Sequence, residues 1–90
     1  MEEKGNRVEI LKLLEEGTKC QNNEINRAKE AYRRAQLLSQ KFEFEDLNLI
    51  SGFNLGTCLV NSGEPRAGVE QLLKILSLLP GIVSNGFSLV

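Results

Sequence analysis

The chain has 90 residues, of which 41% are hydrophobic and 26% charged, and its 11 basic and 12 acidic side chains give a net charge of −1. This size and composition predict one small globular domain, or a piece of a larger one, with a modest core. The charge balance disfavours a nucleic-acid-binding module, which usually carries a basic patch, and it also disfavours a polybasic membrane anchor.

Residues suited to catalysis or metal binding are few. The sequence contains no histidine, which removes the commonest general base and the commonest metal ligand. Cys20 and Cys58 lie far apart and form no CxxC motif, so we interpret them as free thiols packed in a core, with a disulfide or a paired-metal site as the alternatives. We therefore expect no enzymatic activity, no cofactor and no metal ion.

The sequence also bears on the compartment of the protein. The first ten residues are polar and lack the apolar segment of a secretory signal, and no apolar run approaches the length of about 20 residues that spans a bilayer. Free thiols favour a reducing compartment. We therefore expect a cytoplasmic protein without a membrane segment.

Apolar residues at helical spacing predict two helices in the first half of the chain. The first is expected over residues 3–20, followed by a turn in which Asn22 or Asn23 caps the next helix. The second helix is the clearest, because spacings of three and four place its apolar residues on one face. These residues are Ile25, Ala28, Ala31, Tyr32, Ala35, Leu38 and Phe42.

Two further helices are predicted in the second half. Asp46 is expected to cap a third helix that runs to about Asn61. The residues NSGEP then predict a turn, with Gly63 in a left-handed conformation and Pro65 in the first turn of a fourth helix. Pro80 is expected to end that helix. Its predicted apolar stripe consists of Val69, Leu72, Leu73, Leu76 and Leu79.

Charged residues are expected on the outer faces of these helices. Two favourable pairs are predicted at i, i+4, namely Glu30 with Arg34 and Glu70 with Lys74. The second helix also carries a basic cluster, which we interpret as a solvated face, with a patch for an acidic ligand as the alternative. This cluster comprises Arg27, Lys29, Arg33 and Arg34.

The second half carries glycines inside predicted helices, where each costs about 0.8–1 kcal/mol relative to alanine. Four residues of the second helix and four of the fourth helix also share the same spacing of 3, 4 and 3 positions. They are Ile25, Ala28, Tyr32 and Ala35 in one helix and Pro65, Gly68, Leu72 and Ile75 in the other. We interpret Gly56 and Gly68 as the place where two helices approach too closely for a larger side chain.

This pattern resembles the tetratricopeptide repeat family, in which two antiparallel helices cross at small residues. Leu55, Gly56, Leu59, Gly63, Gly68, Leu72 and Pro80 fall at the spacings of the family. In the first half, Gly17 stands about one position off and Cys20 takes the place of the large apolar residue. Gly52 departs from the family, which prefers a large residue there. The period of 40 residues from Ala28 to Gly68 is similar to that of long-period members, since the usual period is about 34.

The resemblance implies an all-α fold made of two antiparallel helix hairpins of a tetratricopeptide-repeat solenoid. The first hairpin is expected over residues 1–41 and is degenerate, and the second is expected over residues 42–80. Residues 81–90 have no helical period and are expected to form an irregular tail. The packing positions of the repeats are then Ala28, Tyr32, Ala35, Leu55, Gly56, Leu59, Gly68, Leu72 and Pro80.

Members of the family bind protein segments on the concave face of the solenoid. The resemblance therefore implies a scaffold or adaptor that binds a peptide or helical segment of a partner protein. The groove residues carried over are Phe53, Asn54, Thr57, Val60 and Asn61. The Asn54 amide can donate and accept hydrogen bonds to a ligand backbone, or it can simply face solvent. A chaperone-type carboxylate clamp is not expected, because Thr57 replaces its usual asparagine.

Two alternatives to an adaptor stay open. The hairpins can be the end or cap of a longer repeat array, in which case they bind nothing alone and pack against further repeats of a longer chain. The last three residues, Ser88, Leu89 and Val90, are similar to a C-terminal ligand of PDZ domains, which adds a strand to the edge of a sheet.

Overall fold

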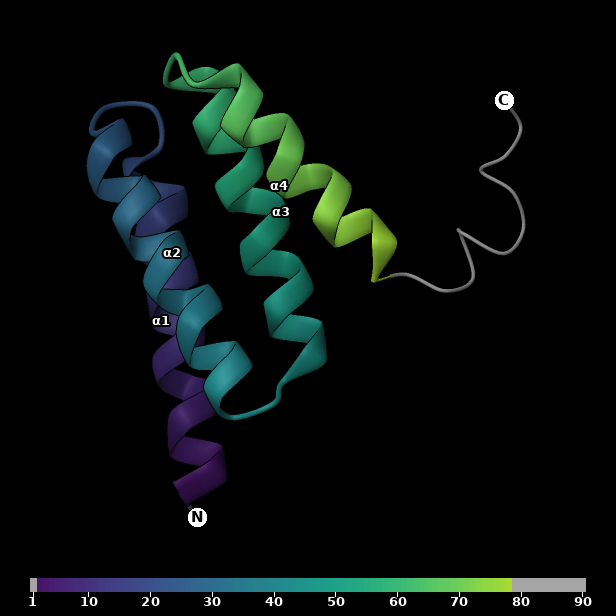
Figure 1. The fold of residues 1–90 in the computed structure, drawn as a ribbon. Coiled ribbons are helices and arrows are strands. Elements are labelled where there is room, and N and C mark those ends of the chain that lie inside the picture. The colour runs from purple at the N-terminus through teal and green to yellow at the C-terminus, as the bar shows by residue number, and fades with distance from the viewer. Residues whose placement is uncertain (1, 79–90) are drawn as a thin grey trace.

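The computed structural model describes residues 2–78, and the side chains of residues 6–78. Its elements are four helices, in the order α1 (Glu2–Cys20), α2 (Ile25–Lys41), α3 (Glu45–Asn61) and α4 (Pro65–Ser77) (Figure 1). No strand occurs within residues 2–78. The predicted all-α fold is therefore confirmed, and the predicted tail over residues 81–90 lies outside the described residues.

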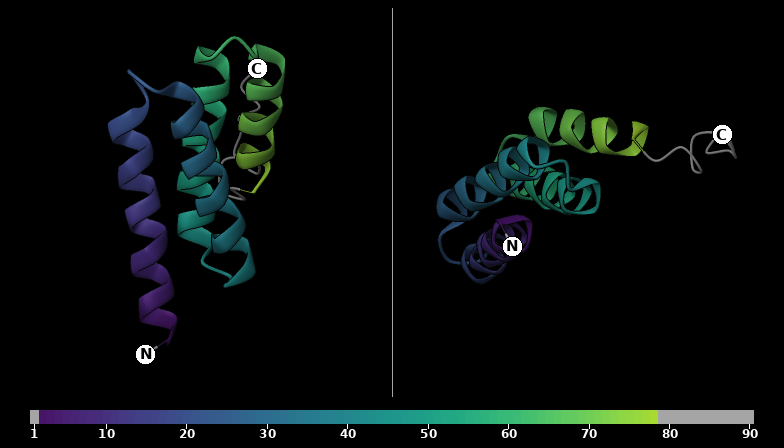
Figure 2. Two further views of the ribbon diagram at one scale, coloured as in Figure 1. Left: turned by 90° about the vertical axis from the view of Figure 1, so that its left-hand side faces the viewer. Right: turned by 90° about the horizontal axis from the view of Figure 1, so that it is seen from below.

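The helices pack in the order in which they occur in the sequence. Each helix lies against the next, α1 barely approaches α3, and α4 packs on α3 alone. The left view of Figure 2 shows the result, a row of helices with α1 and α4 at its two ends. The chain thus forms two hairpins, α1 with α2 and α3 with α4, joined through the contact of α2 with α3.

The N-terminal caps predicted for two helices are wrong. The residue that precedes α2 is Glu24, not Asn22 or Asn23. The residue that precedes α3 is Phe44, not Asp46. Neither Glu24 nor Phe44 makes a side-chain cap hydrogen bond. Asp46 instead lies in the first turn of α3, where a negative charge favours the helix dipole. Backbone hydrogen bonds fix the start of α2, since the Glu24 N–H donates to the Cys20 carbonyl at 2.7 Å.

The C-terminal ends of α2 and α3 share one turn geometry. Gly63 has a φ of 91°, as expected, and Glu43 takes the corresponding place after α2 with a φ of 60°. The next N–H in each case donates back to a carbonyl of the last helical turn, from Phe44 to Ser39 and from Glu64 to Leu59, both at 2.9 Å. These are the bonds of the Schellman motif. Pro65 occupies the first turn of α4, as expected.

The core lies between α1, α2 and α3. Tyr32 is only 1% exposed, and its hydroxyl lies 3.3 Å from the Thr18 hydroxyl. The other buried apolar residues of this cluster are Ile10, Leu14, Ala28, Ala35, Leu47, Leu55, Cys58 and Leu59. Ser39 and Ser51 are buried as well, and each donates its hydroxyl to the carbonyl four residues earlier at 2.7 Å. The buried hydroxyls are therefore satisfied.

The close approach expected at Gly56 and Gly68 is present. A Cβ atom on Gly68 would lie 2.7 Å from the Gly56 carbonyl oxygen and 2.8 Å from the Val60 backbone nitrogen. A Cβ atom on Gly56 would lie 3.2 Å from the Gly68 carbonyl oxygen. Backbone atoms cannot move aside as a flexible side chain can. The contact of α3 with α4 therefore depends on the absence of side chains at both positions.

Two other helical glycines make room for side chains of a neighbouring helix. A Cβ atom on Gly52 would collide with the Ile75 side chain of α4 and approach the Gln36 amide nitrogen of α2 at 2.8 Å. A Cβ atom on Gly17 would lie 2.5 Å from the Tyr32 ring. Gly52, for which the sequence offered no account, therefore marks the place where α2, α3 and α4 meet.

The apolar stripe predicted for α4 is only partly buried. Val69 is 48% exposed and Leu73 is 58% exposed, whereas Gly68 and Ile75 are the residues that α4 buries. The physical reason is that α4 packs on α3 alone, so only a narrow strip of its surface is covered. Leu79 and Pro80 lie outside the described residues.

The ion pairs also differ from those predicted. Glu30 contacts Arg33 at 3.9 Å rather than Arg34. Glu70 and Lys74 form no ion pair in the described part of the chain. The observed long-range pairs join different elements: Arg7 of α1 pairs with Asp46 of α3, and Lys29 of α2 pairs with Glu64 at 2.5 Å.

We predict that Gly68→Ala destabilises the protein by about 1–3 kcal/mol, because the new methyl group overpacks against backbone atoms of α3. The sign of the change in the free energy of unfolding is informative, because replacing glycine by alanine at an exposed helix position stabilises by about 1 kcal/mol. Urea unfolding followed by circular dichroism measures the change. Ala67→Gly, one position earlier and exposed, reports helix propensity alone. A stabilised Gly68→Ala variant would contradict the close approach.

We predict a loss of stability in acid that depends on Arg7. Its guanidinium donates to Asp46 and holds the pKa of that carboxyl below its ordinary value. The unfolded chain then binds more protons than the folded chain as the pH falls through about 4, so the stabilisation present above this range is lost below it. In thermal melts from pH 6 to pH 3, Arg7→Gln should lose less stability than the parent chain.

The matched control for this experiment is Lys12→Gln, which removes one exposed positive charge from the same helix. Its melting temperature should follow the parent chain across the pH range. Equal pH dependence in Arg7→Gln and the parent chain would show that the pair with Asp46 contributes nothing to stability.

Candidate functional site

The predicted ligand-groove residues lie along the outward side of α3. Phe53 is 57% exposed and Val60 is 38% exposed. Asn54 and Thr57 are half-buried, and Asn61 is exposed at the end of the helix. The Thr57 hydroxyl donates to the Phe53 carbonyl at 3.0 Å, so its proton is already committed within the helix.

An apolar hollow of about 280 Å³ lies between α3 and α4. It brings together Phe53 and Asn54 of the predicted groove with Leu49, Ile50 and Ile75. We refer to it as the Phe53 hollow. Thr57, Val60 and Asn61 do not line it. Val60 instead contacts Gly68, since a Cβ atom on that glycine would lie 2.5 Å from a Val60 methyl carbon.

Sequence reasoning missed three residues of the Phe53 hollow. Leu49 and Ile50 precede Phe53 by four and three positions, a spacing that places them on its face of the helix, so the sequence carried a signal for them. Ile75 comes from α4 and reaches the hollow beside Gly52. Its position depends on how the two helices pack, which the sequence pattern does not specify.

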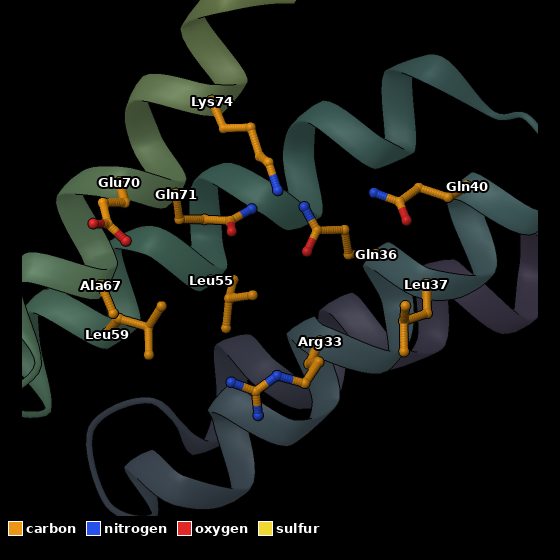
Figure 3. A pocket seen from close by; sticks show the side chains of 10 residues that line it. All are labelled: Arg33, Gln36, Leu37, Gln40, Leu55, Leu59, Ala67, Glu70, Gln71 and Lys74. Carbon is orange, nitrogen blue, oxygen red and sulfur yellow. The ribbon is translucent and has the colours of Figure 1, made fainter.

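A second and larger groove, of about 580 Å³, lies between α2 and α4 (Figure 3). We refer to it as the α2–α4 groove. Leu55 and Leu59 of α3 lie between its two walls, and both are almost completely buried. They were assigned to helix packing from the sequence. None of the predicted ligand-groove residues lines this second groove.

Polar side chains form the walls of the α2–α4 groove. The α2 wall carries Arg33, Gln36 and Gln40, and the α4 wall carries Glu70, Gln71 and Lys74 (Figure 3). Arg33 belongs to the basic cluster for which an acidic ligand was the alternative interpretation. The three glutamines were not singled out in the sequence. They become neighbours only because α3 holds α2 and α4 on either side of it.

Most of the predicted packing positions are buried. Leu72 is half-buried over Gly56, and Pro80 lies outside the described residues. The buried positions are Ala28, Tyr32, Ala35, Leu55, Gly56, Leu59 and Gly68.

Neither cysteine forms a disulfide, and both thiols are free. Cys58 is buried and Cys20 is half-buried. Burial raises the pKa of both thiols, so they are protonated near neutral pH and are poor nucleophiles. Among the side chains of residues 6–78, no group of three or more cysteines and carboxylates is placed to hold a metal ion. No helix in the same part of the chain has the length and hydrophobicity to cross a membrane.

No family model matches the chain, and its comparison with curated proteins and with solved structures gave no significant match.

Proposed function

We propose that the chain is a protein-interaction adaptor of the tetratricopeptide repeat type, which binds a helical or peptide segment of a partner protein beside α3. Support comes from the similarity of the two hairpins and from the Phe53 hollow, which no described helix covers.

The two hairpins use their glycines in the same way. Gly17 of α1 lies against Tyr32 of α2, and Gly56 of α3 lies against Leu72 of α4. The glycine precedes the large residue by 15 positions in the first hairpin and by 16 in the second. This difference of one residue accounts for the position of Gly17, which stands about one place away from that expected from the family spacing. A small residue in one helix and a large one in the next is the arrangement that the family resemblance implies.

The first hairpin indicates what fits beside the second. Ile10 and Leu14 of α1 belong to the buried cluster that α1 forms with α2 and α3. Leu49 and Phe53 follow them by 39 residues, the same offset that relates the glycines of α1 and α3. Phe53 is 57% exposed. By this correspondence, a helix with an apolar face would cover Leu49 and Phe53, as Ile10 and Leu14 are covered within the cluster that α1 forms with α2 and α3.

The single observation that carries the proposal is the exposure of a large aromatic side chain on the wall of an apolar hollow. Aromatic anchors in pockets contribute much of the binding free energy at protein interfaces. Asn54 lies at the same hollow, where its amide can bond to the backbone of a bound segment. No nucleic acid, membrane, cofactor or metal ion enters the proposal, and a cytoplasmic location remains its expected setting.

A structural piece of a longer repeat array is the second candidate. Solenoid repeats contact only their neighbours, and terminal repeats need a polar outer face. The α3–α4 end instead exposes Phe53, Val69 and Leu73, which a further helix of a longer chain would cover equally well. The PDZ-ligand interpretation concerns Ser88, Leu89 and Val90, which lie outside the described residues.

We predict that Phe53→Ala weakens partner binding by about 30-fold, equivalent to about 2 kcal/mol for an aromatic anchor. The full chain is used to select peptides from a displayed random library, and fluorescence anisotropy measures their affinity. The selected peptides should carry apolar residues at helical spacing. Asn54→Ala should reduce the affinity for these peptides by a smaller factor than Phe53→Ala. Leu11→Ala is the control, since Leu11 is also a large apolar residue and is 46% exposed, but lies on α1. If neither Phe53→Ala nor Asn54→Ala changed the affinity, the assignment of the binding site to the Phe53 hollow would be contradicted.

A thermal melt of the full chain, followed by circular dichroism, separates the two candidates. We expect one cooperative transition, because an adaptor that acts alone must fold as a unit. A broad, non-cooperative loss of helix would favour the piece of a longer array, since repeats gain much of their stability from neighbours.

A further inference from the structure

The α2–α4 groove has the properties of a binding site that is separate from the Phe53 hollow. Its volume of about 580 Å³ falls in the range of ligand sites in proteins. Leu55 and Leu59 give it an apolar floor, while side chains that can donate hydrogen bonds line both walls (Figure 3). The two sites draw on different residues of α3. A ligand of the groove therefore need not contact Phe53.

A buried donor in this groove lacks an acceptor. The Gln71 amide nitrogen is inaccessible to solvent and has no hydrogen-bond partner within the described chain. A buried polar group left without a partner costs about 1–3 kcal/mol. The side chain extends from α4 toward the middle of the groove (Figure 3). Once the Gln71 side chain rotates to expose this nitrogen to the groove, a carbonyl or carboxylate oxygen of a ligand can accept its hydrogen bond.

The charges of the groove favour an anionic ligand. Arg33 and Lys74 come from opposite walls, and Glu70 is the one acidic residue among those that line it. Lys74 makes no ion pair with any described residue, and the contact of Arg33 with Glu30 is long, at 3.9 Å. The nearby Glu64 is engaged by Lys29 at 2.5 Å. Among the described residues that line the groove, two cations therefore stand against one carboxylate, which leaves one excess positive charge.

We propose that the α2–α4 groove binds an extended acidic peptide segment of a partner protein. A backbone carbonyl of the peptide accepts a hydrogen bond from Gln71, its carboxylates pair with Arg33 and Lys74, and an aliphatic side chain covers Leu55 and Leu59. The apolar floor favours a peptide over a small inorganic anion. The net charge of −1 for the whole chain disfavours nucleic acid.

The probe is a synthetic, fluorescein-labelled peptide in which glutamate and leucine alternate, and the matched control peptide has glutamine in place of glutamate. Anisotropy titrations use the full chain at low ionic strength. We expect the acidic peptide to bind at least 10-fold more tightly than the glutamine peptide, and added salt to weaken it. Equal binding of the two peptides, or no binding of the acidic one, would overturn the proposal.

Gln71→Met tests the role of the unpaired amide. Methionine keeps the approximate volume and length of the side chain but removes the unsatisfied donor, so the melting temperature should stay the same or rise. Affinity for the acidic peptide should fall by about 5-fold. Arg33→Gln and Lys74→Gln should each weaken it by about 2–5-fold. A lowered melting temperature with unchanged affinity would show that Gln71 serves only the fold.

Phe53→Ala distinguishes this inference from the proposed function. It should leave the affinity for the acidic peptide unchanged while it weakens peptides selected for the Phe53 hollow. Loss of acidic-peptide binding in Phe53→Ala would place that peptide in the hollow and overturn the assignment to the α2–α4 groove.

Discussion

The contact between the backbones of α3 and α4 at Gly56 and Gly68 is the constraint on which the second half of the structure depends. Once the two helices touch there, Leu72 lies over Gly56 and Ile75 lies over Gly52. The register of α4 along α3 follows from these two contacts. The same contacts bring Ile75 to the Phe53 hollow and place the α4 wall opposite α2.

Helical periodicity and turn residues were sufficient to predict the fold class and the approximate helix limits. Gly63 and Pro65 identified the turn between α3 and α4 because only a few residue types suit those conformations. The caps at Asn22 and Asp46 were wrong, since backbone hydrogen bonds rather than side chains fix the helix starts. The exposure of Leu73 was missed because apolar spacing does not tell how many neighbours a helix has.

The candidate sites were less accessible to sequence reasoning than the fold. Phe53 was singled out through the family resemblance and is 57% exposed, and its role as a ligand-groove residue stays a prediction. The α2–α4 groove could not be anticipated, because Arg33 and Gln71 are 38 residues apart and meet only through the packing of α3. Whether the amide of Gln71 finds a hydrogen-bond partner depends on its three-dimensional surroundings, so it could not be predicted from the sequence.

The sequential packing of the helices has a consequence for how the molecule opens. Because the backbone of α4 lies close to α3 and not to α1 or α2, α4 can separate with little disturbance of the cluster around Tyr32. At the other end, α1 contacts α3 as well as α2 through Arg7. The Arg7 guanidinium pairs with Asp46 and lies 5.4 Å from the Phe44 ring centroid. Among the four helices, amide protons should therefore exchange with solvent earliest along α4, and a protease should cleave α4 before the other three helices.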